Sequence, residues 1–116
     1  MVKQEYVPQR GDFVRLDFSP QIGHEQAGLR PAIVLSDSTY NAKSGLMIVC
    51  PITKHSKGYP FEVKVEKGQV VHGVVLSDHI KNVDWRGRSA KFLGKANDIL
   101  VAQVSSNLGL LLGCDV

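Results

Sequence analysis

The stretch Asp12–Phe18 (DFVRLDF) predicts the first structural element of the chain and, through it, the fold class. Its apolar side chains Val14, Leu16 and Phe18 are separated by single charged residues. Successive side chains of a β-strand point to opposite faces of the sheet, so this alternation is typical of a strand with one buried face. The sequence thus predicts a sheet-forming chain from near its beginning.

Further short strands follow the first one, separated by polar segments that contain Ser, Asn, Gly and Pro. Turn signals about 8–12 residues apart favour a small barrel over alternating strands and helices. We expect the polar stretch Asp37–Gly45 to form a turn or a short irregular segment. The expected strands are Ala32–Leu35, Leu46–Ile52, Phe61–Val65, Val70–Leu76 and Ala90–Leu93, while Asp78–Val83 is ambiguous.

The apolar period lengthens from two to between three and four after Asn97, which predicts an amphipathic C-terminal helix. Asn97 or Asp98 can cap its beginning, and Gly113 can end it. The expected fold class is therefore mainly β with a C-terminal α-helix, built from five to six strands. The apolar stripe of this helix consists of Leu100, Val101, Val104, Leu108 and Leu111.

Size and charge limit the class of protein. The 116 residues fit a single domain, residues 1–116, and exclude a large enzyme with a separate cofactor domain. No apolar run approaches the ~20 residues of a membrane span, and the beginning of the chain lacks the apolar core of a signal peptide, so a cytoplasmic protein is expected. Cys50 and Cys114 match no zinc-binding spacing and are expected to be free thiols. A net charge of +3 permits a polyanionic partner without requiring one.

The loop Gly23–Pro31 (GHEQAGLRP) is the first candidate site. It gathers a His, a Glu and an Arg between two expected strands, and polar loops on rigid strands often carry function. Pro31 biases Arg30 towards an extended conformation, which would place the guanidinium at the mouth of a strand. A solvated loop in which Arg30 pairs with Glu25 is the alternative.

Two further stretches are rich in basic side chains. Lys54, Lys57 and Tyr59 follow the end of an expected strand, and such interleaving suits single-stranded nucleic acid through phosphate contacts and base stacking. The run Arg86–Lys95 directly follows a tryptophan and holds four positive charges and no negative one, which suits a polyanion. A plain hairpin and a solvated face are the respective alternatives.

No metal or cofactor is expected. The four histidines lie far apart in the sequence and form no ligand pair at helical spacing. The chain also lacks a P-loop, a G-x-G-x-x-G turn and a G-x-S-x-G nucleophile motif. Any catalysis is therefore expected to rely on the side chains of the protein itself.

The stretch GDFVRLDFSPQIGHEQAGLRPAIVLS (Gly11–Ser36) resembles the signature of the MazF/PemK toxin family. The shared pattern is Gly-Asp, a strand ending in Asp-x-x-Pro, and Gly-x-Glu-Gln-x-Gly-x-Arg-Pro followed by an apolar strand. PITKHSKGYPFEV (Pro51–Val63) and LSDHIKNVDWRGR (Leu76–Arg88) are also similar to members of this family. The resemblance covers the chain from Gly11 to the C-terminal helix.

This resemblance implies a small SH3-like barrel of the CcdB/PemK type, with attached helices, that works as a homodimer. It implies the toxin of a toxin–antitoxin pair: a sequence-specific, ribosome-independent and metal-independent endoribonuclease, or mRNA interferase, that inhibits translation and growth. Members cleave single-stranded RNA to a 2′,3′-cyclic phosphate and a 5′-hydroxyl without a cofactor. The implied partners are RNA and a cognate MazE-like antitoxin with an acidic flexible tail.

The resemblance also carries site residues. Arg30 matches the family's arginine, which can stabilise charge on the phosphoryl oxygens, and Thr53 matches a threonine that can bond the phosphate. Glu25 matches the family's glutamate and can accept the proton of the 2′-hydroxyl. His24 stands where many members have serine, and its pKa range makes it a second general-base candidate. The choice of base between Glu25 and His24 stays open.

The alternative function is that of a CcdB-like gyrase poison, which shares the fold, binds a protein and cleaves no RNA. A catalytically inactive SH3-like binding module is a third reading. A gel of labelled single-stranded RNA incubated with the protein separates the three. The expected RNA-binding residues are His24, Gln26, Lys54, Lys57, Tyr59, Arg86 and Arg88.

Overall fold

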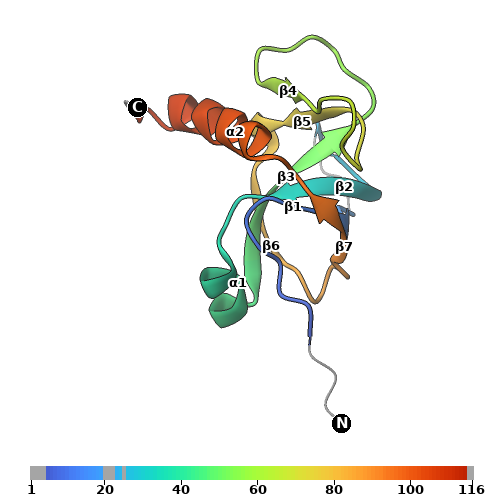
Figure 1. Ribbon diagram of the computed structural model, residues 1–116, viewed down its shortest axis with the longest axis vertical. Coiled ribbons are helices and arrows are strands. Elements are labelled where there is room, and N and C mark those ends of the chain that lie inside the picture. The colour runs from blue at the N-terminus through green and yellow to red at the C-terminus, as the bar shows by residue number, and fades with distance from the viewer. Residues whose placement is uncertain (1–4, 20–22, 25, 115–116) are drawn as a thin grey trace.

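The computed structural model describes residues 5–19, 23–24 and 26–114 and shows a β-rich fold with a C-terminal helix (Figure 1). The strands form one seven-stranded antiparallel arrangement in the order β4-β5-β3-β2-β1-β7, and β6 also pairs with β3. The elements are β1 (Asp12–Asp17), β2 (Leu29–Val34), α1 (Ser38–Ser44), β3 (Leu46–Thr53), β4 (Glu62–Lys64), β5 (Val74–Leu76), the 3₁₀ helix η1 (Ser77–His79), β6 (Lys81–Asp84), β7 (Lys91–Lys95) and α2 (Asp98–Leu111).

The predicted fold class, mainly β with a C-terminal helix, is confirmed. The ladder of paired strands runs from β4 to β7, and within the described part of the chain no hydrogen-bonded pair joins these two outer strands. The barrel is thus a strongly curved sheet rather than a closed ring of hydrogen bonds. The described residues form one strand more than the five to six expected. The additional strand is β6, most of which lies in the stretch Asp78–Val83 that the sequence left ambiguous.

The central strand is β3, which pairs with β2 on one side and with β6 and then β5 on the other. A proline within a strand usually indicates a sheet edge or the end of the strand, but Pro51 lies inside β3, opposite Ala32 of β2. Proline has no N–H to donate to a ladder, and Pro51 lies where the second partner of β3 changes from β6 to β5. The strand can therefore continue past this proline to Thr53.

Both faces of the sheet are buried in its central part. Phe13 and Ile33 pack on one face together with Leu100, Val104 and Leu108 of α2, and this helix covers that face. On the other face, a second cluster is closed by side chains from β6 and the turn after it. The predicted half-buried β1 is thus buried on both sides at its beginning. Members of the second cluster include Val14, Leu16, Phe18, Ala32, Val34, Met47, Val49, Val83 and Trp85.

The stretch expected to be a turn or irregular contains the helix α1, so this prediction is wrong. Asp37 caps the helix: its Oδ1 accepts hydrogen bonds from the backbone N–H groups of Thr39 (2.8 Å) and Tyr40 (3.1 Å). Gly45 ends it in the left-handed conformation, at φ 73°. Ser and Asn residues are common in turns and also at the ends of short helices. The sequence pattern of a short capped helix therefore resembles that of a turn.

Other boundaries differ by a few residues. The strand expected at Val70–Leu76 is limited to Val74–Leu76, because Gly73 adopts a φ of 127° that interrupts extended pairing. The ambiguous stretch Asp78–Val83 separates into the end of η1 and most of β6. The strand expected at Ala90–Leu93 is Lys91–Lys95.

Asn41 connects α1 to the rest of the fold. Its side chain is fully buried, and its Nδ2 donates to the carbonyls of Pro8 (2.8 Å) and Ser36 (3.1 Å). Its Oδ1 accepts a 2.6 Å hydrogen bond from the Ser36 hydroxyl, and its backbone carbonyl accepts one of 2.9 Å from Trp85 Nε1. Through its side chain and its backbone carbonyl, this one residue thus satisfies polar groups from three separate segments.

We expect Asn41→Ala to lower the free energy of unfolding by at least about 2 kcal/mol, because it leaves buried carbonyl and hydroxyl groups without partners. Urea denaturation measures the change. Asn82→Ala is the matched control, since the Asn82 side chain is exposed and bonds only the Tyr40 hydroxyl, at 2.9 Å, among the described residues. Equal losses in the two variants would contradict a structural role for the buried amide.

Candidate active site

Arg30 lies near the beginning of β2, where the strand leaves the preceding loop. Its side chain is half-buried, and its Nε–H donates a 2.7 Å hydrogen bond to the carbonyl of Ala27. The remaining N–H donors belong to the terminal nitrogens, which can fork two oxygens of a phosphate. Arg30 is therefore a cation held in place by the turn of the loop that precedes it.

Thr53 is the last residue of β3 and is 6% exposed. Its Oγ1 accepts a 3.2 Å hydrogen bond from the backbone N–H of His55, while the hydroxyl hydrogen can serve a further acceptor. In the β2–β3 ladder Ala32 lies opposite Pro51, and residues two positions apart on a strand point to the same face. Arg30 and Thr53 each lie two residues from that pair, so they share one face at the same end of the two strands.

The loop between β1 and β2 is fixed at its base by hydrogen bonds. The backbone N–H of Phe18 donates to the carbonyl of Gly28 at 2.9 Å, and the N–H of Gly28 donates to Ser19 Oγ at 3.2 Å. Arg88 reaches over from the turn before β7 and donates from Nη1 to the carbonyls of Asp17 (3.0 Å) and Ser19 (2.7 Å). The position from which the loop projects is therefore set by four side-chain and backbone bonds.

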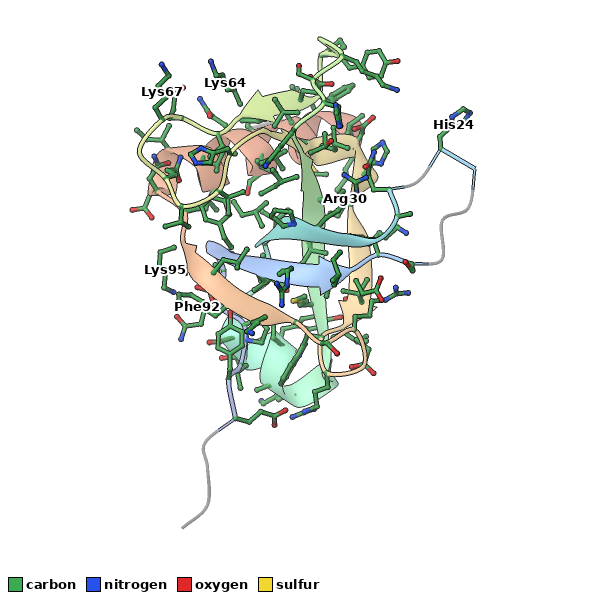
Figure 2. The ribbon with its side chains drawn as sticks, turned by 90° about the vertical axis from the view of Figure 1, so that its right-hand side faces the viewer. His24, Arg30, Lys64, Lys67, Phe92 and Lys95 are labelled. Atoms are coloured by element: carbon green, nitrogen blue, oxygen red, sulfur yellow. The ribbon has the colours of Figure 1, made fainter. Side chains whose placement is uncertain are left out.

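A cavity of about 280 Å³ lies beside Thr53 and brings two predicted stretches together. The β1–β2 loop contributes His24 and Gln26, and the β3–β4 loop contributes Lys57 and Tyr59. Arg30 is at the strand end from which the first loop extends, and His24 lies further out on that loop (Figure 2). Glu25, the remaining candidate of this loop, lies outside the described residues. The other lining residues are His55, Glu62, Leu76, Asp78 and His79.

Asp78 and His79 were not among the residues selected from the sequence. They belong to η1, which directly follows β5, and β5 pairs with the end of β3 at Thr53. This pairing brings them to the cavity; they lie within the stretch Leu76–Arg88 that resembles the toxin family, but no role was assigned to either residue there. His55 was also missed, although it lies between two selected lysines and polar loop residues beside a candidate threonine are a usable signal.

Glu62 holds the β3–β4 loop in shape. Its carboxylate accepts hydrogen bonds from the Ser56 hydroxyl (2.6 Å) and from the backbone N–H groups of Lys57 (3.0 Å) and Gly58 (3.2 Å). The bond from Ser56 is the main cause that lowers the pKa of Glu62, followed by the bond from Lys57. An ionised Glu62 thus fixes the loop on which the Lys57 ammonium lies 6.0 Å from the centre of the Tyr59 ring.

The two arginines of the predicted basic patch have partners inside the protein. Arg86 forms a two-point ion pair with Glu5, at 2.6 and 3.0 Å, and its guanidinium lies 4.3 Å from the centre of the Trp85 ring. The bond from Arg86 lowers the pKa of Glu5. Arg88 donates hydrogen bonds to two carbonyls at the base of the β1–β2 loop, as described above. Neither residue lines the cavity beside Thr53.

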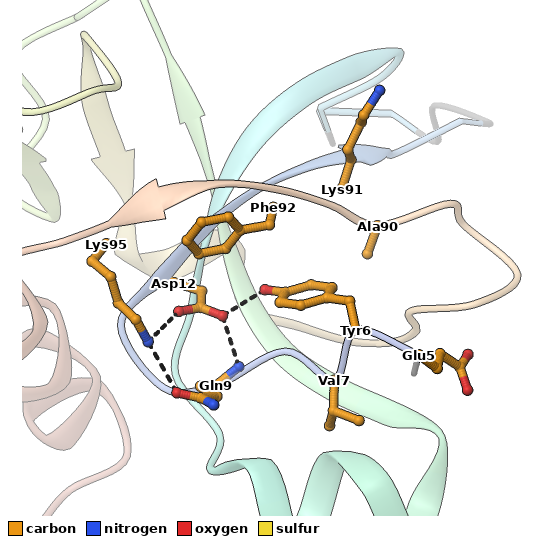
Figure 3. A pocket seen from close by; sticks show the side chains of 9 residues that line it. All are labelled: Glu5, Tyr6, Val7, Gln9, Asp12, Ala90, Lys91, Phe92 and Lys95. Carbon is orange, nitrogen blue, oxygen red and sulfur yellow. Dashed lines mark hydrogen bonds and ion pairs between the residues drawn. The ribbon is translucent and has the colours of Figure 1, made fainter. Parts of the chain in front are cut away.

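The lysines of the same run line a separate cavity of about 720 Å³, between the segment before β1 and β7 (Figure 3). Lys95 forms a 2.7 Å ion pair with buried Asp12 and donates to Gln9 Oε1 at 3.0 Å. The Tyr6 hydroxyl donates to the other oxygen of Asp12, and burial together with this bond raises the pKa of Tyr6. Much of the basic run thus holds the N-terminal segment against the sheet.

Cys50 and Cys114 are free thiols, as expected from the sequence. Cys50 lies in β3, and its Sγ–H donates to the carbonyl of Ser77 at 3.6 Å. Burial, with a contribution from Asp78, raises the pKa of Cys50 to about 12. The thiol therefore stays protonated near neutral pH, which excludes Cys50 as a nucleophile despite its closeness in sequence to Thr53.

Gly73, which directly precedes β5, lies against the backbone of Thr53. A methyl group on Gly73 would collide with the carbonyl carbon and oxygen of Thr53, and the φ of 127° is one that L side chains rarely adopt. The Gly73 carbonyl in turn accepts a 2.9 Å hydrogen bond from the N–H of Val65. The backbone of the candidate site is thus packed directly against the turn before β5.

The described residues contain neither a helix that could cross a membrane nor a group of three or more His, Cys, Asp or Glu side chains placed to hold a metal ion.

Comparison with known proteins gives the same assignment by family, by sequence and by structure. The family model for PemK-like, MazF-like toxins of type II toxin–antitoxin systems matches residues 9–112. The chain is 44% identical over 108 residues to the endoribonuclease toxin MazF of Escherichia coli K12, covering 93% of this chain and 96% of that protein. It is 40% identical over 101 residues to the endoribonuclease toxin ChpB of the same strain, covering 82% and 85%.

Among solved structures, MazF from Deinococcus radiodurans superposes with a TM-score of 0.91 at 51% identity, covering 94% of this chain and 99% of that one. A MazE–MazF structure from the same organism gives a TM-score of 0.85 at 45% identity, with 96% and 100% covered. The class that fold and relatives define is that of the endoribonuclease toxins. The chain belongs to the family of PemK-like, MazF-like toxins of type II toxin–antitoxin systems.

We expect Gly73→Ala to displace the Thr53 backbone and to lower the free energy of unfolding by about 1–3 kcal/mol, as overpacking does. Gly68→Ala is the matched control: it also has a positive φ, of 95°, but its added methyl would meet nothing within 4 Å. Urea denaturation and the amide NMR shift of Thr53 are the measurements. If both variants lose the same stability and neither moves the Thr53 signal, the close approach does not position Thr53.

Proposed function

We propose that this protein is a toxin that cleaves single-stranded RNA, chiefly mRNA, at specific sequences without the ribosome or a metal ion, and thereby inhibits translation and growth. The observation that carries the proposal is the placement of Arg30 and Thr53 on one face of the paired ends of β2 and β3, beside a polar cavity. A fixed cation and a neutral hydroxyl at one point suit a phosphodiester, whose charge grows as the nucleophile attacks.

In the proposed reaction the 2′-oxygen attacks the adjacent phosphorus and the bond from phosphorus to the 5′-oxygen breaks. The 2′-hydroxyl loses its proton to a base, and the leaving 5′-oxygen takes up a proton, so the products are a 2′,3′-cyclic phosphate and a 5′-hydroxyl. Arg30 stabilises the charge on the non-bridging oxygens through its terminal N–H groups. Thr53 donates its hydroxyl hydrogen to the same phosphate without changing its own protonation state.

The base is Glu25 or His24, the two acid–base residues of the loop that ends at Arg30. His24 lines the cavity beside Thr53, where a neutral imidazole could accept the proton. Glu25 could instead orient Arg30. The pH–rate profiles of His24→Ala and Glu25→Gln test the choice: the base is the residue whose replacement removes the limb of the profile that reports its deprotonation.

The RNA bases would be read by the loops that surround the cavity. Gln26 offers an amide for base edges, Lys57 and Lys54 offer charge for phosphates, and the exposed ring of Tyr59 offers a stacking surface. Arg86 and Arg88 remain proposed RNA ligands. Both already have partners within the protein, so a contact with RNA would either add to those bonds or replace them.

The proposed partners are a cognate MazE-like antitoxin with an acidic flexible tail and a second copy of this chain. Complexes of MazE with MazF from Deinococcus radiodurans support the first, since those MazF chains are 45–48% identical to this one. An acidic segment would compete with RNA for the same cations. A gyrase poison of the CcdB type is disfavoured because Arg30, Thr53 and the cavity would then have no function.

We expect Arg30→Ala to fold normally and to cleave RNA at least about 10²-fold more slowly, because a charge-stabilising donor is lost. The measurement is the cleavage rate of labelled single-stranded RNA. Arg15→Ala is the control, since Arg15 is an exposed arginine of the neighbouring strand that faces Pro31 in the ladder. Near wild-type turnover in Arg30→Ala, or an equal loss in Arg15→Ala, would refute the assigned role.

We expect excess chelator to leave the cleavage rate unchanged, because the proposed chemistry uses only side chains of the protein. The measurement compares initial rates with and without EDTA, and product ends are mapped for cyclic phosphate. Inhibition by EDTA that Mg²⁺ reverses would overturn the metal-independent reaction. Gyrase inhibition without any RNA cleavage would instead favour the gyrase poison.

A further inference from the structure

A further cavity, here called the second cavity and distinct from the one beside β7, adjoins the candidate active site on the other side of the β3–β4 loop. It measures about 580 Å³, and it shares Tyr59 and Glu62 with the cavity beside Thr53. The two cavities therefore meet along one loop, and a chain-like ligand that leaves the first can enter the second. Basic side chains line the second cavity: Lys54, Lys64, Lys67 and His72.

The lysines of this cavity are not neutralised within the protein. Across residues 5–19, 23–24 and 26–114 no ion pair joins Lys54, Lys64 or Lys67 to a carboxylate. The one carboxylate on the wall is Glu62, and its oxygens are bonded to Ser56 and to backbone N–H groups. The cavity thus presents several positive charges and no free negative charge.

The direction of these side chains is set by the strand beneath them. Val63 and Val65 are buried on either side of Lys64, so alternation turns Lys64 out of the core. The bond from Val65 N–H to the Gly73 carbonyl closes the turn that carries Lys67. Lys64 and Lys67 extend in the same direction away from the sheet (Figure 2).

We propose that this cavity is a subsite for the phosphates of nucleotides that flank the cleaved bond in single-stranded RNA. The proposal rests on the proposed RNA cleavage and extends it to Lys64 and Lys67, two residues outside the predicted site. Tyr59, 60% exposed between the two cavities, provides a surface on which a base can stack as the strand passes. Lysine ammonium groups hold the backbone without reading bases, so the subsite supplies affinity and not choice of cut sequence.

A flanking subsite makes affinity depend on RNA length. An RNA that carries only the cut sequence would reach Arg30 and Thr53 but not Lys64 and Lys67. A longer RNA with the same cut sequence would gain the two lysine contacts and bind more tightly. Each phosphate contact on a single strand contributes about 0.7 to the slope of log K against log salt, so two contacts contribute about 1.4.

The test compares the double variant Lys64→Gln/Lys67→Gln with the wild type on a minimal RNA and on one of about 20 nucleotides, longer than the roughly 4–16 nucleotides that a small single-strand-binding fold covers. We expect KM for the long RNA to rise about 10-fold, with kcat and the rate on the minimal RNA unchanged. The salt slope for the long RNA should fall by about 1.4.

Arg15→Gln/Lys43→Gln is the matched control, because it removes the same charge from exposed basic residues of β1 and α1. Thermal denaturation of both variants shows that they fold. Equal weakening by the two variants would show a general charge effect and overturn the subsite. Equal weakening of the minimal and the long RNA by Lys64→Gln/Lys67→Gln would overturn it as well.

A binding measurement separates this proposal from RNA cleavage itself. A 2′-O-methyl version of the long RNA lacks the attacking hydroxyl and reports affinity alone. If the wild type cleaves no RNA, the proposed function fails, while a loss of affinity confined to Lys64→Gln/Lys67→Gln would still support a phosphate-binding cavity. If the 2′-O-methyl RNA binds that variant as tightly as the wild type, the subsite is refuted even where cleavage is confirmed.

Discussion

The antiparallel ladder between β2 and β3 is the constraint on which the candidate site depends. Its register, with Ala32 opposite Pro51, puts Arg30 and Thr53 on one face at one end of the two strands. A slip by one residue would turn one of the two side chains to the opposite face. Burial on both faces of these strands opposes such a slip, because each apolar set would leave the cluster into which it is packed and meet the other one. The core thus determines the geometry of the candidate site through the register of β2 and β3 rather than through direct contact.

The loops around the site are held by polar bonds at their bases. Arg88 anchors the β1–β2 loop through two carbonyls, and Glu62 anchors the β3–β4 loop through a hydroxyl and two N–H groups. Each anchor satisfies backbone groups that turns leave without partners in a ladder. Residues 23–24 of the first loop and 54–60 of the second are exposed, so a ligand meets accessible side chains on a fixed framework.

The sequence allowed the strands with clear alternation or long apolar runs to be predicted, together with the C-terminal helix, because their periodicity reports burial directly. It did not allow α1 to be predicted, since a mostly polar segment of seven residues with a cap at each end resembles a turn. Arg30 and Thr53 were selected because they match residues of the family. Asp78 and His79 were not selected, although they lie in a stretch that resembles the family, because their place in the cavity comes from the β3–β5 pairing.

Local charge density in the sequence does not by itself indicate which basic side chains stay unpaired in the fold. The run Arg86–Lys95 has the densest positive charge, but Arg86 pairs with Glu5, Arg88 binds loop carbonyls and Lys95 pairs with buried Asp12. A cation that already neutralises a carboxylate contributes little to the attraction of a phosphate. The lysines around the β3–β4 loop are spread more thinly along the chain, yet β4 and the turn after it gather them in one cavity beside the candidate site. Among the described residues, Lys54, Lys64 and Lys67 thus form a group of cations that the fold leaves without carboxylate partners beside the candidate site.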